Sequence, residues 1–165
     1  MIKYSFLLFL IPLFFFCGNP SDDGSFTTSS IEEDYSSIEN PRERWQAYRL
    51  SDYYIEQGWS CECFPPGGCE SYIIDNSIAD VKYTLPGEAY FGRNEEDIYN
   101  YTKDMANTID EAFALIEKYE NSADKIEVEY DPRFGFPTKL FIDIDAQMAD
   151  EEIIRSFGTL KKIVP

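Results

Sequence analysis

The chain has 165 residues, of which 31 are acidic, 14 are basic and none is histidine, and its formal net charge is −17 at pH 7. This length gives room for one domain, and an apolar share of 44% is too high for a disordered chain, so most of it should fold. The missing histidine excludes Ser-His and Cys-His nucleophile pairs, and the negative charge argues against a nucleic-acid-binding protein.

Residues 1–16 have the outline of a signal peptide. One base, Lys3, precedes an apolar run that ends at Cys17 and is shorter than the roughly 20 residues a membrane-spanning helix needs. A Cys at this point resembles the lipidated first residue of mature bacterial lipoproteins, although Phe16 stands where a small residue is usual. We expect export, lipid attachment at Cys17 and a membrane-anchored protein. The alternatives are a retained anchor helix and an incidental thiol.

Residues 17–39 are expected to form a flexible acidic tether that begins at the lipidated Cys. They are rich in Ser, Thr, Gly and acidic residues and show no apolar period. The folded domain is therefore expected over residues 40–165.

The first half of this domain should contain one helix and three strands. Asn40, Pro41 and Glu43 form a capping pattern that predicts a short helix through about Tyr48. Apolar and polar residues then alternate in three segments, which predicts an antiparallel meander with one solvated face. The strands are expected at about 53–63, 69–74 and 78–85, with a turn over 64–68.

Residues 86–107 are predicted to form a long loop with at most one helical turn. The segment carries Tyr90, Phe91, Tyr99 and Tyr101, and no core period explains them. Exposed aromatic residues among polar ones are typical of binding surfaces. Alternatively, the loop folds over the open sheet face and buries them, and the sequence leaves both interpretations open.

The second half should contain one helix and three more strands. Thr108 and Glu111 form a capping box that opens a helix over 109–120, in which apolar residues repeat at helical spacing. Strands are expected at about 125–131, 138–144 and 153–160. The order α-βββ-α-βββ predicts an α+β fold, an antiparallel sheet of about six strands with two helices packed on one face.

The turn over residues 131–137 is expected to set the strand register. Asp131 can accept hydrogen bonds from backbone amides of the turn, and Pro132 fixes φ at the first bend. Gly135 supplies a positive φ, and Pro137 limits pairing before the next strand. A register slip by one residue would move one set of apolar side chains into water.

Several features of the chain together resemble one family. They are Trp45, the Cys61-Glu62-Cys63 pair, the capped helix from Thr108, the run 130–137, Ile142-Asp143 and the acidic stretch 149–152. Over roughly residues 42–160 the chain is similar to bacterial lipoproteins catalogued as domain of unknown function 6174. The resemblance implies a signal peptide, an envelope location and a single α+β domain. It implies no established activity and supplies no catalytic residues.

If Cys17 is lipidated, three thiols remain, and we expect one structural disulfide among them. Cys61 and Cys63 lie two residues apart in a strand, at or beyond bridging distance. Cys63 and Cys69 flank the expected turn, so we favour this pair, with Cys61–Cys69 as the alternative. A three-thiolate zinc site lacks a fourth Cys or His, and acidic neighbours disfavour a reactive thiol.

Asp143, Asp145 and Asp150 are the weak candidates for a metal site. Their spacing begins like a calcium loop but lacks the central Gly and the terminal Glu. A solvated acidic face is the simpler interpretation, and paired carboxylates for sugar hydrolysis would arise by chance in so acidic a chain. We expect no metal and no cofactor.

These observations predict a cell-envelope lipoprotein that is a non-catalytic binding or structural module. Its expected partners are the membrane, through the lipid, and an envelope protein. The alternative is an uncharacterised acidic extracytoplasmic enzyme or a weak calcium-binding protein.

Overall fold

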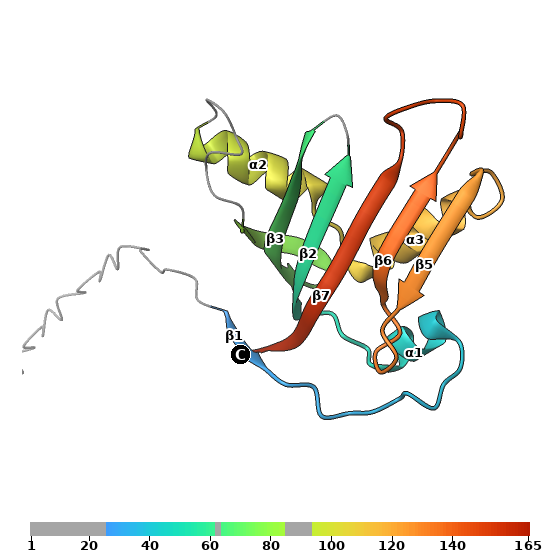
Figure 1. Ribbon diagram of the computed structural model, residues 1–165. Coiled ribbons are helices and arrows are strands. Elements are labelled where there is room, and N and C mark those ends of the chain that lie inside the picture. Colours follow the sequence, from blue (N-terminus) through green and yellow to red (C-terminus); the bar gives the residue numbers. More distant parts are fainter. Residues whose placement is uncertain (1–25, 62–63, 85–93) are drawn as a thin grey trace, which may run out of the picture.

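The computed structural model describes residues 26–61, 64–84 and 94–165, and for residues 61 and 64–66 it describes the backbone alone. In chain order its elements are β1 (Thr27–Ser29), α1 (Pro41–Ala47), β2 (Tyr53–Cys61), β3 (Phe64–Ile74), β4 (Ser77–Tyr83), α2 (Glu95–Met105), α3 (Ile109–Tyr119), β5 (Lys125–Tyr130), β6 (Pro137–Asp143) and β7 (Ile153–Val164) (Figure 1).

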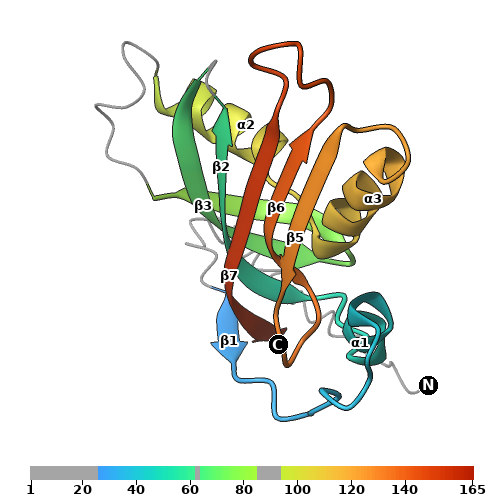
Figure 2. The same ribbon diagram turned by 45° about the vertical axis from the view of Figure 1, so that its right-hand side comes forward.

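The strands form one sheet in the order β4-β3-β2-β7-β6-β5, and β1 pairs with the C-terminal end of β7. All of these pairings are antiparallel. Figures 1 and 2 show α2 and α3 behind one face of the sheet, and none of the described helices covers the other face. This is an α+β arrangement, with one helix and one strand more than the sequence predicts.

The core lies between the sheet and its helices. Successive strand residues point to opposite faces, so Ile55 of β2 and Ile73 of β3 both turn inward and are fully buried. Trp45 of α1 and Phe113 of α3 belong to the same buried cluster. A second apolar cluster, beside α2, consists of Trp59, Cys69, Val81 and Ala106.

Helix α2 corrects the prediction of a loop over residues 86–107. Asn94 caps the helix, because its Oδ1 accepts a hydrogen bond from the Asp97 N–H at 2.8 Å. Three acidic residues in the first turn suit the positive end of the helix dipole. Ile98 and Thr102, one turn apart, are buried. The charged residues before Ile98 and after Thr102 hide this narrow inward face in the sequence.

The β2–β3 hairpin turns earlier than the sequence predicts. Residues 64–68 lie in β3 and not in a turn, and Cys61 pairs directly with Phe64. A strand containing Gly67 loses side-chain packing at that position. Here the Trp59 ring fills the space, because a Cβ on Gly67 would lie 2.2 Å from the Trp59 Cε2 atom.

Residues 26–39, called the N-terminal strap below, lie along the domain where the sequence predicts a free tether. β1 pairs with β7, and Ile31 is 4% exposed. The Arg133 guanidinium donates a 2.6 Å hydrogen bond to the Ile31 carbonyl. The tether prediction is therefore wrong from residue 26 onward, and residues 17–25 lie outside the described ranges.

The expected signal peptide, residues 1–16, also lies outside these ranges. In the part of the chain that the structure describes, no helix has the length and apolar character to cross a membrane.

Candidate binding surface

The sheet face without helices is called the open face below. Residues paired directly across antiparallel strands share a face, so the register identifies its members. Tyr54 pairs with Tyr72 and Gly58 pairs with both Gly68 and Ser156. Ser156 pairs in turn with Lys139. The same face also carries Glu56, Glu70, Lys82, Glu127, Glu129, Phe141, Ile154 and Lys161.

One corner of the open face is closed by aromatic side chains. The Tyr54 and Tyr72 ring centroids are 5.4 Å apart, and Phe26 of the N-terminal strap stacks on Tyr72 at 4.7 Å. The Lys82 and Lys161 ammonium groups lie over the two tyrosine rings. Burial and the nearby carboxylates raise the pKa of the Tyr54 hydroxyl, which therefore stays protonated at neutral pH.

Two carboxylates lie side by side next to this corner. Glu56 of β2 pairs directly with Glu70 of β3. The Tyr54 hydroxyl donates to Glu56 Oε1 at 3.3 Å, and the Tyr72 hydroxyl donates to Glu70 Oε2 at 3.4 Å. Among the described residues, no Lys or Arg forms an ion pair with either carboxylate. Like charges directly opposite each other destabilise a sheet.

A groove crosses the open face beside the two carboxylates. Its floor includes the paired small residues Gly58 and Ser156. A hollow of about 260 Å³ lies over Glu56, Gly58, Ser156 and Gly158. A second hollow of about 230 Å³ also reaches Ser156 and extends over β6. The two hollows therefore meet at Ser156.

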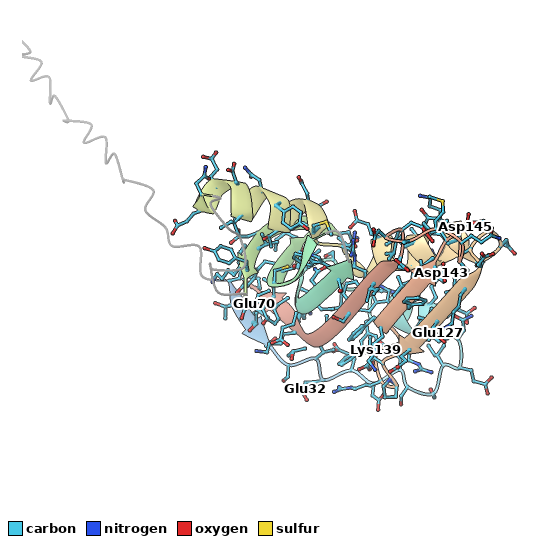
Figure 3. All side chains as sticks on the ribbon, turned by 45° about the horizontal axis from the view of Figure 1, so that its top comes forward. Glu32, Glu70, Glu127, Lys139, Asp143 and Asp145 are labelled. Carbon is cyan, nitrogen blue, oxygen red and sulfur yellow. The ribbon has the colours of Figure 1, made fainter. Side chains whose placement is uncertain are left out.

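The second hollow is bounded by apolar and paired charged residues. Phe141 pairs with Ile154, whose side chain is 36% exposed. On the strand edge beyond them, Lys125 and Lys139 form 3.0 Å ion pairs with Glu127 and Glu129, respectively. Figure 3 shows Glu127 and Lys139 near the β5 edge of the sheet and Glu70 toward the other edge. These carboxylates form ion pairs, whereas Glu56 and Glu70 form none among the described residues, although Lys82 pairs with Glu70 across the strands.

The 131–137 turn has the geometry that its sequence suggests. Asp131 Oδ1 accepts hydrogen bonds from the Arg133 and Phe134 amides at 2.8 and 2.7 Å. Gly135 has a φ of +83°, and its N–H donates to the Asp131 carbonyl at 2.9 Å. Pro137 is the first residue of β6 and pairs with Tyr130.

The same turn is also a junction between distant segments. Arg44 of α1 donates to the Pro132 carbonyl at 2.7 Å and to the Ile38 carbonyl of the strap at 2.7 Å. The Tyr48 hydroxyl donates to the Arg133 carbonyl at 3.2 Å. The turn therefore holds α1 and the strap against the β5–β6 hairpin, and nothing in the sequence marked Arg44 for this position.

The family-model comparison matches residues 37–162 to the family of unknown function DUF6174. The chain belongs to this family. The comparisons of this chain with curated proteins and with solved structures found no match. The family match covers the domain from the end of the N-terminal strap through most of β7, including both faces of the sheet.

The DUF6174 domain does not contain the predicted disulfide at Cys69, which is a free and buried thiol. The expected partner, Cys63, lies outside the described residues. Cys69 pairs with Gln57, five residues along β3 from the rung of Cys61, or about 16 Å. That distance excludes the Cys61–Cys69 alternative. Burial raises the pKa of the Cys69 thiol to about 11, and its sulfur lies 3.2 Å from Ser71 Oγ.

The acidic candidates do not form an ion site in the DUF6174 domain. The described residues contain no group of three Cys, His, Asp or Glu residues placed to hold a metal. Figure 3 shows Asp143 and Asp145 at the same end of the sheet. The Asp145 amide donates to Glu151 Oε1, and Asp145 Oδ1 accepts from the Gln147 amide. Asp150 has a φ of +72° in the same loop. Asp145 and Glu151 therefore hold the loop, whereas Asp143 Oδ1 and Glu151 Oε2 are buried without a hydrogen-bond partner in the part of the chain that the structure describes.

The aromatic residues of α2 pack inward and do not form the exposed surface considered from the sequence. Tyr99 and Tyr101 pack against the apolar cluster around Trp59. The Tyr99 hydroxyl also donates to Asp80 Oδ1 at 3.0 Å. Tyr90 and Phe91 lie outside the described residues. The sequence signal for the open face was instead the polar half of the β2 alternation, including Tyr54 and Glu56.

Proposed function

We propose that this DUF6174 protein is an exported lipoprotein of the cell envelope that acts as a non-catalytic binding module. In this proposal lipid at Cys17 attaches it to the membrane, and the open face binds an envelope protein. The observation that carries the proposal is a sheet with helices on one face and, among the described residues, no helix on the other, which is grooved and partly apolar.

The side chains of the open face support binding more than folding. Phe141 and Ile154 present apolar surface next to the groove. Glu56 and Glu70 lie opposite each other and form no ion pair among the described residues, although Lys82 is the other cross-strand neighbour of Glu70. Adjacent like charges and partly exposed apolar side chains are features that stability alone does not favour. They are typical of surfaces that a partner covers.

The N-terminal strap supports a short link between membrane and domain. Phe26 already contacts Tyr72 on the open face. Nine Cα-to-Cα steps separate Cys17 from Phe26, and at full extension they reach about 30 Å. A lipid at Cys17 would hold the open face near the membrane surface. We therefore propose a partner that is itself close to the membrane.

Partition into a detergent phase tests the anchor. We expect the native protein to enter the detergent phase and the Cys17→Ser variant to remain in the aqueous phase. Mass spectrometry should find a diacylglyceryl group on Cys17. An aqueous native protein with an intact Cys17 thiol would refute the lipoprotein proposal.

Site-specific photo-crosslinking tests the binding surface. A photoreactive residue is placed at Ser156, in the groove, and in a matched variant at Lys118 on the outer side of α3; both positions are exposed. In cells that produce the full chain, we expect a discrete crosslinked protein from position 156 and none from position 118. The same crosslinks from both positions, or none from position 156, would refute a binding role of the open face.

A further inference from the structure

We propose that the open face recognises a basic side chain of an extended partner segment. The charged end of this Arg or Lys lies between Glu56 and Glu70, and an apolar side chain of the same segment packs on Ile154 and Phe141. This inference rests on the proposed function and names the chemistry of its partner.

The charge of the site favours a cation. Glu56 and Glu70 come from adjacent strands at one rung of the sheet, so their carboxylates repel each other. Lys82 pairs directly with Glu70 on the other side of β3, and Lys161 pairs with Tyr54. Their ammonium groups lie over the Tyr72 and Tyr54 rings, and no ion pair joins them to either carboxylate among the described residues. A guanidinium or ammonium group placed between the two carboxylates removes the repulsion and gains charge-assisted hydrogen bonds.

The space beside the carboxylates suits the stem of such a side chain. At the next rung Gly58 pairs with Gly68, so neither strand contributes a side chain, and only the small hydroxyl groups of Ser156 and Thr84 lie over these two residues. Glycine in the interior of a strand weakens it and often marks close approach by a ligand or another backbone. The hollow of about 260 Å³ over Gly58 and Gly158 opens toward Glu56. An aliphatic stem can lie on this floor.

The opposite wall of the groove defines the second anchor. Ile154 pairs with Ser60, which lies four residues from Glu56 along β2, or about 13 Å. In an extended segment, residues i, i+2 and i+4 point to one side and span the same length. A basic residue at i, a small residue at i+2 and an apolar residue at i+4 therefore match the carboxylates, the glycine floor and Ile154 in order.

The remaining occupants fit the site less well. A nucleic acid or an anionic lipid headgroup would meet a chain with a formal charge of −17. A divalent cation would find two carboxylates, and no group of three metal-binding side chains exists among the described residues. A basic protein segment matches both the charge and the shape of the groove.

Peptide binding by the full chain in detergent micelles tests the inference. The probe is fluorescein-labelled Arg-Thr-Gly-Thr-Leu, and its control carries Glu in place of Arg. At low ionic strength we expect saturable binding of the first peptide alone, read by fluorescence anisotropy and weakened by added salt. Replacing both carboxylates, Glu56→Gln with Glu70→Gln, should weaken binding by about tenfold or more.

Two further variants separate local recognition from net charge. Glu95→Gln with Glu96→Gln removes the same charge from exposed positions on α2 and should leave the affinity within about twofold. Gly158→Val keeps every charge but fills the hollow, since a Cβ there would lie 3.3 Å from Glu56 Oε2. It should weaken binding without unfolding the protein, as a thermal melt would verify.

The inference is overturned if the Glu-containing peptide binds equally well, if the Glu56/Glu70 variant keeps its affinity, or if the α2 variant loses as much. Stabilisation by CaCl₂ alone that requires Glu56 and Glu70 would make the site a metal site and would also overturn it. A crosslink from position 156 with no peptide binding refutes the basic segment alone. If position 156 gives no crosslink in cells, the proposed function itself is refuted.

Discussion

The two faces of the sheet are built from the same strands and are used differently. On β2, Tyr53 and Ile55 turn toward the helices and are at most 1% exposed. Even the polar Gln57 on that side is satisfied, donating to Ser71 Oγ at 2.7 Å and accepting from the Asn107 amide at 2.8 Å. On the open face, Glu56 lies opposite another carboxylate.

The difference separates stability from binding within one sheet. The covered face removes apolar surface from water, which favours the folded state. It also satisfies Gln57, although Trp59 Nε1 and Thr102 Oγ1 are buried without a hydrogen-bond partner among the described residues. The open face carries a like-charge pair and two paired glycines, both of which weaken a sheet. Local features that conflict with stability tend to mark functional sites. Substitutions on the two faces should therefore have different effects.

The largest effect is expected at Gly135, because the 131–137 turn helps fix which residues of β5 and β6 face the core. Gly135 has a positive φ, and a Cβ there would lie 2.2 Å from the Pro41 carbonyl oxygen. Gly135→Val should lower the free energy of unfolding on the order of 3–5 kcal/mol through backbone strain and overpacking. Urea denaturation measures this loss, with Gly135→Ala as the milder variant if valine prevents folding.

Gly158→Ala is the matched control for Gly135, since Gly158 has no positive φ and its added Cβ would meet a flexible carboxylate. Its effect should stay within about 1 kcal/mol. Equal losses in the two variants would show that the turn does not hold the register.

Substitutions at two neighbouring residues of β6 allow a direct comparison of the two faces. Ile142 points to the core and is fully buried, whereas Phe141 lies on the open face. Ile142→Ala should cost about 2–5 kcal/mol, and Phe141→Ala should cost under about 1 kcal/mol. Urea denaturation of both variants measures the two losses in the free energy of unfolding and so gives their ratio. A larger loss at Phe141 would contradict the division of roles between the faces.

Alkaline pH should weaken the covered face through Cys69. Burial raises the pKa of this thiol to about 11, whereas the unfolded thiol titrates near its usual value of 9.0. Between these values the folded state retains a proton that the unfolded state loses, so stability is full below pH 9 and falls as pH rises through 11. The loss should be about 2–3 kcal/mol at most.

The Cys69→Ala variant is the control for this effect. Unfolding free energies at pH 8 and pH 10.5 should differ less in the variant than in the native protein, because other alkaline groups are common to both. An identical pH dependence would mean that the thiol titrates normally in the folded protein.

The sequence predicted which residues lie on each face of the sheet, but not which of them pair across adjacent strands. The alternation along β2 places Ile55 on one face and Glu56 on the other, and the position of the hairpin turn does not change this. A turn over residues 64–68 would place Glu56 opposite Asn76, whereas the observed register places it opposite Glu70. Both registers keep the same residues on the same face. The carboxylate pair was therefore invisible until the turn position was known.

The helices show the same limit of prediction from the sequence. The capping box at Thr108 and Glu111 predicted α3, and both of its hydrogen bonds are present. Helix α2 has an equally regular cap at Asn94, but its narrow buried side is interrupted by acidic and amide residues. The pairing of β1 with β7 depends on contacts between opposite ends of the chain. Local sequence patterns carry no information on such contacts.

The smallest and most specific prediction is a gain in stability on the open face. Glu56→Gln keeps one oxygen, which can accept the Tyr54 hydrogen bond, and removes the repulsion from Glu70, at the loss of the long 3.4 Å hydrogen bond that Glu56 Oε2 accepts from the Thr159 amide. It should raise the free energy of unfolding by up to about 1 kcal/mol at low salt, and by less at high salt. Once Glu56 is neutral, adding Glu70→Gln should give little further gain, because the two charges interact. Urea denaturation of the two single variants and the double variant completes this double-mutant cycle. A loss of stability in Glu56→Gln would show that the folded protein already balances this charge, and the open face would then lack the unpaired carboxylates that a basic partner needs.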